Sequence, residues 1–147
     1  MLSRFEAFTG YISAINRYIQ KIERDEMEKY GLKGSYAQYL VAMDNHADGL
    51  SAAELCDICD RDKAAVSRII SEMESRGLVI RSDSLYRAKL RLSEEGRKAA
   101  AFVRDRAKTA VEMAGKGLND NDRQSFYAAL GLISNNLQRI CREGLKE

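Results

Sequence analysis

The 147-residue sequence has no proline, a single histidine, three cysteines and no long apolar run. Proline averages about 5% of residues and ends or kinks helices, so its absence predicts a mostly helical chain. No apolar run approaches the roughly 20 residues of a membrane-spanning helix. The first residues carry an acid early and lack the apolar block of a signal peptide. We therefore expect a globular cytoplasmic protein built as one compact unit with helical extensions.

Side chains that support catalysis or bind metals are scarce. The only histidine, His46, lies in DNHADG, where we expect a solvated helix end, and it leaves little for general-base chemistry. No glycine-rich phosphate loop or nucleophile elbow is present. Cys56 and Cys59 form a CxxC pair, which could indicate redox chemistry or zinc, but they fall inside a predicted helix and we interpret them as core packing. Cys141 remains a candidate redox sensor if it is exposed. We expect no enzyme, no cofactor and no metal site.

Two long helices with apolar seams are predicted at the two ends of the chain. In the first, over about residues 2 to 28, the seam advances in steps of three and four through Phe5, Phe8, Ile12, Ile15, Ile19 and Ile22. In the last, over about residues 120 to 143, it runs through Phe126, Leu130, Ile133, Leu137 and Ile140. The seams either pack on each other within one chain or, as we favour, also interlock with the same helices of a second copy in a symmetric homodimer.

Three shorter helices are predicted between these two. Residues 35–46 form one, with four apolar side chains on one face: Tyr36, Tyr39, Leu40 and Met43. Ser51, followed three residues later by Glu54, predicts a capping box that opens a brief second helix. The third runs over residues 62–76 and is ended by Gly77, a C-terminal glycine signal.

After Gly77 the apolar period changes from helical to alternating. This change predicts a two-stranded hairpin over about residues 78–82 and 86–92. Ser93 is expected to cap a further helix that runs to about residue 114. The inward side chains of that helix are expected to be Ala99, Phe102, Val103 and Met113.

The helix over residues 62–76 has an unusual outer face in its first turns. Where a solvated helix would more often present long carboxylates, this face is small and cationic: Lys63, Ala64, Ser67 and Arg68. Residues 61–91 carry a net charge of +4, against −2 for the rest of the chain. This distribution is expected of a subunit that presents one face to a polyanion.

A brief capped helix, a tight turn, this longer helix and a basic hairpin together describe a winged helix-turn-helix. The DNA major groove, roughly 12 Å wide, admits one helix if the leading side chains are short. Ala64 and Ser67 allow that approach, and Lys63 and Arg68 can reach phosphates or base edges. Ser51 would offer its hydroxyl and nearby backbone N–H groups to a phosphate. We therefore predict a double-stranded DNA-binding protein.

The stretch ELCDICDRDKAAVSRIISEMESRGLVIR, followed by YRAKLRLSEEG, resembles the MarR family of bacterial transcription regulators. The resemblance covers residues 32–98, and the flanking seams suit the family's dimerisation helices. It implies an obligate homodimer in which two winged helices read a palindrome and a wing arginine, here Arg87, enters the minor groove. Arg81 and Ser84 are expected to touch phosphate. The wing is shorter than the family's usual arginine-rich run.

The resemblance also implies a division of the chain and a mode of regulation. It assigns residues 1–30 and 99–147 to dimerisation and residues 31–98 to DNA binding. It suggests a repressor that a small ligand or an oxidant releases, with a cavity for an aromatic or phenolic molecule between the two regions. The hypothetical lining is Tyr11, Tyr36 and Tyr39, for which plain packing is the alternative. The alternative to operator binding is a winged helix that binds another protein.

Overall fold

The computed structural model describes residues 3–82 and 88–146. It is mainly α-helical with one two-stranded antiparallel sheet, which confirms the expected fold class. The chain divides into two compact units, Met1–Lys108 and Thr109–Glu147. The predicted assignment of segments to dimerisation and DNA binding concerns function and stays a prediction.

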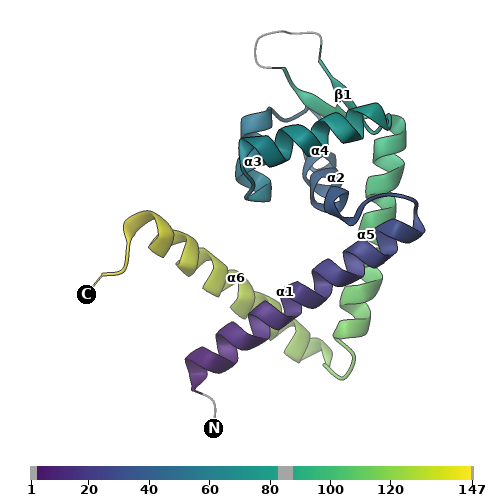
Figure 1. The fold of residues 1–147 in the computed structure, drawn as a ribbon. Helices are drawn as coiled ribbons and strands as arrows, with labels where there is room; N and C mark the ends of the chain where they lie inside the picture. The colour runs from purple at the N-terminus through teal and green to yellow at the C-terminus, as the bar shows by residue number, and fades with distance from the viewer. Residues whose placement is uncertain (1–2, 83–87, 147) are drawn as a thin grey trace. The chain divides into compact units, whose positions relative to one another are not determined.

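The order of elements agrees with the sequence pattern. Along the chain they are α1 (Arg4–Lys29), η1 (Gly34–Tyr36), α2 (Ala37–Asp44), α3 (Ala52–Cys59), α4 (Lys63–Ser75), β1 (Val79–Arg81), β2 (Leu90–Leu92), α5 (Glu94–Ala114) and α6 (Asp120–Glu143). In the first unit, α2, α3 and α4 gather beside the sheet, which extends from one end of this helical group (Figure 1). Within the described residues, no helix is long and apolar enough to cross a membrane.

Helix ends lie where the capping residues predict them. The Ser51 hydroxyl accepts a hydrogen bond from the Glu54 backbone N–H at 3.1 Å. The Asp62 carboxylate accepts one from the Ala65 N–H at 2.7 Å and so begins α4. Gly77, with φ of 75°, follows the end of α4. Each cap satisfies a backbone group that the helix itself leaves unpaired.

The core of the first unit is formed by the end of α1, η1, α2, α3, α4, the sheet and the start of α5. Its largest fully buried side chains include Tyr36, Tyr39, Met27, Leu40, Leu55 and Met73. Cys59 is buried within this core and Cys56 packs against it. Both cysteines of the CxxC pair therefore pack with the core, as the sequence predicts.

The sheet is smaller than the predicted hairpin but has an additional partner. Val79 pairs with Leu92 and Arg81 with Leu90, whereas the predicted strand residues 86 and 87 lie outside the described residues. Leu50, just before α3, forms an isolated bridge to Leu90, with N–H to oxygen distances of 3.0 and 2.8 Å. The bridge attaches the base of the wing to the segment that leads into α3. Sequence periodicity did not indicate this pairing because Leu50 stands alone between two helices.

Helix α5 contributes to the core only through its first half. Ala99 and Val103 are buried, and Phe102 stacks on Tyr30 with ring centroids 4.6 Å apart. The prediction that Met113 points inward is wrong, since its side chain is 71% exposed. The buried positions of α5 end at Val103.

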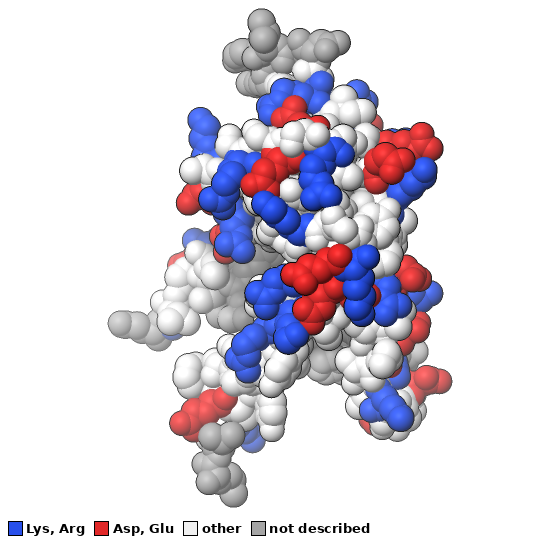
Figure 2. Space-filling view, turned by 45° about the vertical axis from the view of Figure 1, so that its right-hand side comes forward, with Lys and Arg blue, Asp and Glu red and all other residues white. Residues whose placement is uncertain are grey.

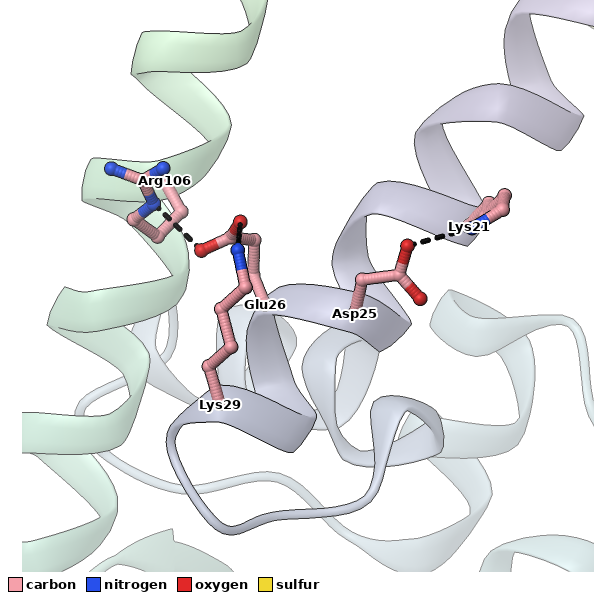
Figure 3. A network of polar contacts seen from close by, with 5 residues as sticks. All are labelled: Lys21, Asp25, Glu26, Lys29 and Arg106. Atoms are coloured by element: carbon pink, nitrogen blue, oxygen red, sulfur yellow. Dashed lines mark hydrogen bonds and ion pairs between the residues drawn. The ribbon is translucent and has the colours of Figure 1, made fainter.

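An ion-pair cluster joins the end of α1 to α5. The Glu26 carboxylate accepts hydrogen bonds from Lys29 at 2.8 Å and from Arg106 at 2.9 Å (Figure 3). The Lys29 contact first, and then Arg106, lowers the pKa of Glu26. Lys21 and Asp25 form a separate pair on the same helix. The last turns of α1 are thus held to the first unit through Arg106.

Both predicted terminal helices are present, and their apolar seams are exposed. In α1, every seam residue from Phe5 to Ile22 is between 40% and 74% exposed. In α6, no residue is buried, and Phe126 and Leu137 are 45% and 48% exposed. The homodimer that we favoured as cover for these seams stays a prediction.

Candidate nucleic-acid interface

Helix α4 has one buried face and one exposed face. The buried face consists of Val66, Ile69, Ile70 and Met73, each no more than 7% exposed. The opposite face of the first turns is exposed and carries the predicted side chains: Lys63, Ala64, Ser67 and Arg68. The structure thus brings these four predicted residues together on one surface.

The cationic groups of this surface are available to a ligand. Neither Lys63 nor Arg68 makes a hydrogen bond or an ion pair with another described residue. Lys63 is the first residue of α4, where the helix dipole disfavours a positive charge. A lysine at this position gains nothing from its own helix, which is consistent with a role toward an external anion.

Helix α3 and the turn after it hold α4 in place. Asp60 ends α3 in the left-handed region with φ of 50°, the one non-glycine residue of the described chain with positive φ. Asp and Asn adopt this conformation more readily than other side chains. Ser51 lies half-buried at the N-cap of α3, where its hydroxyl already binds the Glu54 N–H. Its predicted contact with phosphate stays a prediction.

The structure describes one of the three predicted wing residues, Arg81. Arg81 donates a hydrogen bond to Glu74 of α4 at 2.6 Å and keeps 47% of its side chain exposed. This ion pair ties the wing base to α4. Ser84 and Arg87 lie outside the described residues, so their predicted contacts are not placed.

A second contact to α4 was not predicted. Lys33 and Tyr36 both donate to Glu72 Oε2, at 2.9 and 3.0 Å. Lys33 lowers the pKa of Glu72 most, followed by Tyr36, and the same contact raises the pKa of Lys33. Burial is the main cause that raises the pKa of Tyr36. No spacing rule connects side chains that lie 36 and 39 residues apart, so only the tertiary structure reveals this cluster.

The proposed ligand-lining tyrosines lie in different environments. Tyr36 and Tyr39 are each 1% exposed, whereas Tyr11 is 69% exposed on α1. A cavity of about 230 Å³ does occur in the first unit, but none of the three tyrosines lines it; its lining is Met43, Asp44, Ala47, Ile80, Arg91, Leu92 and Arg97. The aromatic ligand site therefore stays a prediction.

Charge alone does not mark the interface. On the face drawn in Figure 2, lysine and arginine side chains are interspersed with acidic ones and do not form one continuous basic patch. Over the described residues, no cluster of three or more His, Cys, Asp or Glu side chains could hold a metal ion. The candidate interface is therefore the exposed outer face of α4, with Lys63 and Arg68, and its role in binding stays a prediction.

Comparisons with known proteins agree with this geometry. Residues 30–85 match the profile of the MarR family. Among solved structures, the chain is similar to a MarR family transcriptional regulator from Listeria monocytogenes in complex with a 26mer DNA. That structure has 22% identity and a TM-score of 0.77 over 100% of this chain and 99% of the other. A MarR regulator from Methanosarcina mazei Go1 has 23% identity and a TM-score of 0.85 over 95% and 94%.

A third similar structure is the MepR–DNA complex of Staphylococcus aureus, with 16% identity and a TM-score of 0.75 over 88% of this chain and 97% of the other. Among curated proteins, none matches this sequence. At these identities the solved structures establish the fold, and the family profile matches residues 30–85 of the 147-residue chain. Residues 30–85 of this chain therefore resemble the MarR family, and the chain shares the winged helix-turn-helix fold of the MarR regulators to which it is similar.

Proposed function

We propose that this regulator binds a pseudo-palindromic operator as a homodimer in the cytoplasm and represses transcription by occupying the promoter. The observation that carries the proposal is the outer face of α4, where Lys63 and Arg68 are exposed and make no hydrogen bond or ion pair with another described residue. The small side chains of Ala64 and Ser67 between them permit close approach to the major groove.

Each α4 would enter the major groove of one half-site. Arg68 suits bidentate contact with guanine, and Lys63 suits a phosphate. Two recognition helices in a dimer would read half-sites about one helical turn, roughly 34–36 Å, apart. In the wing, Arg87 would reach the minor groove, with Arg81 and Ser84 at phosphates.

The homodimer is supported by the exposed apolar seams of α1 and α6. Apolar stripes of this length are costly to leave in water, and most soluble oligomers are symmetric homodimers. Two of the similar structures are themselves complexes with DNA. They support DNA as the partner over another protein.

Release from the operator would follow a shift between two spacings of the recognition helices. Such a shift requires a ligand with different affinity for the two states. Two triggers of this shift can be tested. One is a phenolic ligand that contacts Tyr11, Tyr36 or Tyr39, and the other is oxidation of the exposed Cys141. Operator affinity that does not respond to phenolic compounds or to peroxide would remove this part of the proposal and leave operator binding intact.

The test begins with selection of duplexes from a random pool by the purified protein. The selected duplex is then titrated across a salt series with the wild type and two variants, Lys63→Ala and Arg68→Ala. We expect an inverted repeat and a loss of about 1–3 kcal/mol for a base-reading arginine, while removal of a phosphate-binding lysine lowers the salt slope by about 1.

Lys21→Ala is the matched control, because it removes one positive charge from α1, outside the helix-turn-helix. We expect its affinity to stay near that of the wild type. A reporter gene behind the selected operator then distinguishes repression from activation. Failure of a folded dimer to enrich any sequence would contradict operator binding and favour the protein-binding alternative.

A further inference from the structure

We propose that Glu72 is a positioning residue for operator binding, which fixes the recognition helix α4 on the segment 31–36. The proposal rests on the proposed function, because position matters only if α4 reads DNA. Glu72 itself is a carboxylate and is unsuited to contact a phosphate. Its effect on affinity would come from where it holds α4.

The first support is the anchoring of the Glu72 carboxylate. Its Oε2 atom accepts hydrogen bonds from Lys33 Nζ at 2.9 Å and from the Tyr36 hydroxyl at 3.0 Å. Tyr36 is only 1% exposed, so core packing fixes its ring and the direction of its hydroxyl. Hydrogen bonds to a charged group are stronger than neutral ones. The attachment therefore reaches from α4 to the buried core of the first unit.

The second support is another attachment one turn further on, at the residue that caps the C-terminal end of α4. Arg76 donates a hydrogen bond to the backbone oxygen of Gly31 at 2.7 Å. Residues 72 and 76 are four apart and lie on the same side of a helix. A helix held at one point can pivot about it, whereas two attachments to the same segment remove that freedom. The segment 31–36 thus holds the C-terminal half of α4.

The third support is the position of Arg68. It lies one turn before Glu72, on the same side of α4; its charge adds to the lowering of the Glu72 pKa, whose main cause is Lys33, and opposes the rise in the Lys33 pKa that Glu72 causes. The row of residues 68, 72 and 76 therefore has a proposed DNA contact at one end and the two attachments at the other. A movement of α4 that breaks the attachments would displace Arg68 relative to the groove.

Two explanations of Glu72 make opposite predictions. If Glu72 mattered only as a negative charge, Glu72→Gln would leave Arg68 and Lys33 with less compensation, and DNA binding would become tighter and more salt-dependent. If Glu72 positions α4, the same substitution weakens binding. The salt slope then stays unchanged, since Glu72 neutralises no phosphate.

The experiment uses the full-length protein and the selected operator duplex. We expect Glu72→Gln to weaken binding about 3- to 30-fold, the range seen for residues that act through a contiguous network. Glu95→Gln is the matched control: it removes the same charge, but its partner Lys98, 3.4 Å away, lies on the same helix. We expect the control to leave affinity unchanged. Tighter binding by Glu72→Gln, or a steeper salt slope, would overturn the proposal.

A double-mutant cycle separates positioning from general destabilisation. Tyr36→Phe removes only the hydroxyl that binds Glu72, so its effect on affinity should largely disappear in a Glu72→Gln background. Fully additive effects would refute the shared attachment. Thermal melts of all variants confirm that each is folded at the assay temperature. The exchanged pair Lys33→Glu with Glu72→Lys should recover part of the lost affinity.

Failure of the proposed function remains distinguishable from failure of this inference. If the wild type enriches no duplex, operator binding fails and the role of Glu72 in it fails too. The attachment is measured separately by hydrogen exchange of the α4 amides in the free protein, which should be faster in Glu72→Gln than in Glu95→Gln. Equal exchange in the two variants would show that Glu72 does not hold α4.

Discussion

Replacing Gly96 with alanine should destabilise the protein, although alanine is the better helix former. Gly96 is buried near the start of α5, where an added Cβ would lie 2.1 Å from the backbone oxygen of Leu78 and 3.2 Å from Leu92 Cβ. The Leu78 oxygen also accepts the Ser93 N–H at 2.9 Å, so it is held in place. Either α5 or the strand must shift to admit the methyl group.

The magnitude follows from two opposing effects. Overpacking a close-packed site costs about 1–3 kcal/mol, and the upper end applies here because the opposing atom belongs to the backbone. Replacing glycine with alanine within a helix stabilises the folded state by about 1 kcal/mol through helix propensity. The net loss is about 2 kcal/mol, which lowers the melting temperature of a chain of this size by about 4–8 °C.

Gly10→Ala supplies the control. Gly10 is exposed in α1, nothing lies within 4 Å of an added Cβ, and at about 100° per residue it lies opposite the apolar seam. Only the helix-propensity gain of about 1 kcal/mol applies, so its melting temperature should rise by about 2–4 °C. Calorimetry or circular dichroism measures both variants. A Gly96→Ala protein as stable as the wild type would refute the close approach of α5 to Leu78.

Three further perturbations test other parts of the structure. Met73→Ala opens a cavity behind the recognition helix, since Met73 is 0% exposed, and should cost about 2–5 kcal/mol in denaturant unfolding. Glu72→Gln should lower the melting temperature at pH 7. Because Lys33 holds the Glu72 pKa below its usual 4.5, that difference should vanish as pH falls through the lowered value; a difference that persists there would contradict the ion pair. Ile15→Glu introduces a charge into the exposed seam of α1 and should shift a sedimenting dimer toward monomer, whereas an unchanged mass would place the interface elsewhere.

Local sequence signals predicted the features that depend on residues close together in the chain. The caps at Ser51 and Asp62, the stop at Gly77 and both long terminal helices follow from short-range hydrogen bonding and periodicity. The exposed face at the start of α4 follows for the same reason, since a period of 3.6 residues fixes which side chains share a side. These signals also predicted the fold class.

These local signals could not predict contacts between residues far apart in the sequence. Leu50 pairs with Leu90, Lys33 with Glu72 and Arg106 with Glu26, across separations of about 40 to 80 residues. The sequence around a charged side chain does not indicate which opposite charge will pair with it in the folded protein. Met113 was wrongly placed inside for a related reason: periodicity identifies an apolar side of α5 but not the point at which the core beneath it ends.

The sequence by itself therefore determined the helices, their caps and the residues on the outer face of the recognition helix, because each depends on groups within a few positions of one another. The tertiary structure decided how that helix is held. Glu72 and Arg76 bind the segment 31–36, and Arg81 of the wing binds Glu74. These contacts exist only after the core around Tyr36 has packed, since packing is what brings distant polar groups within hydrogen-bonding distance.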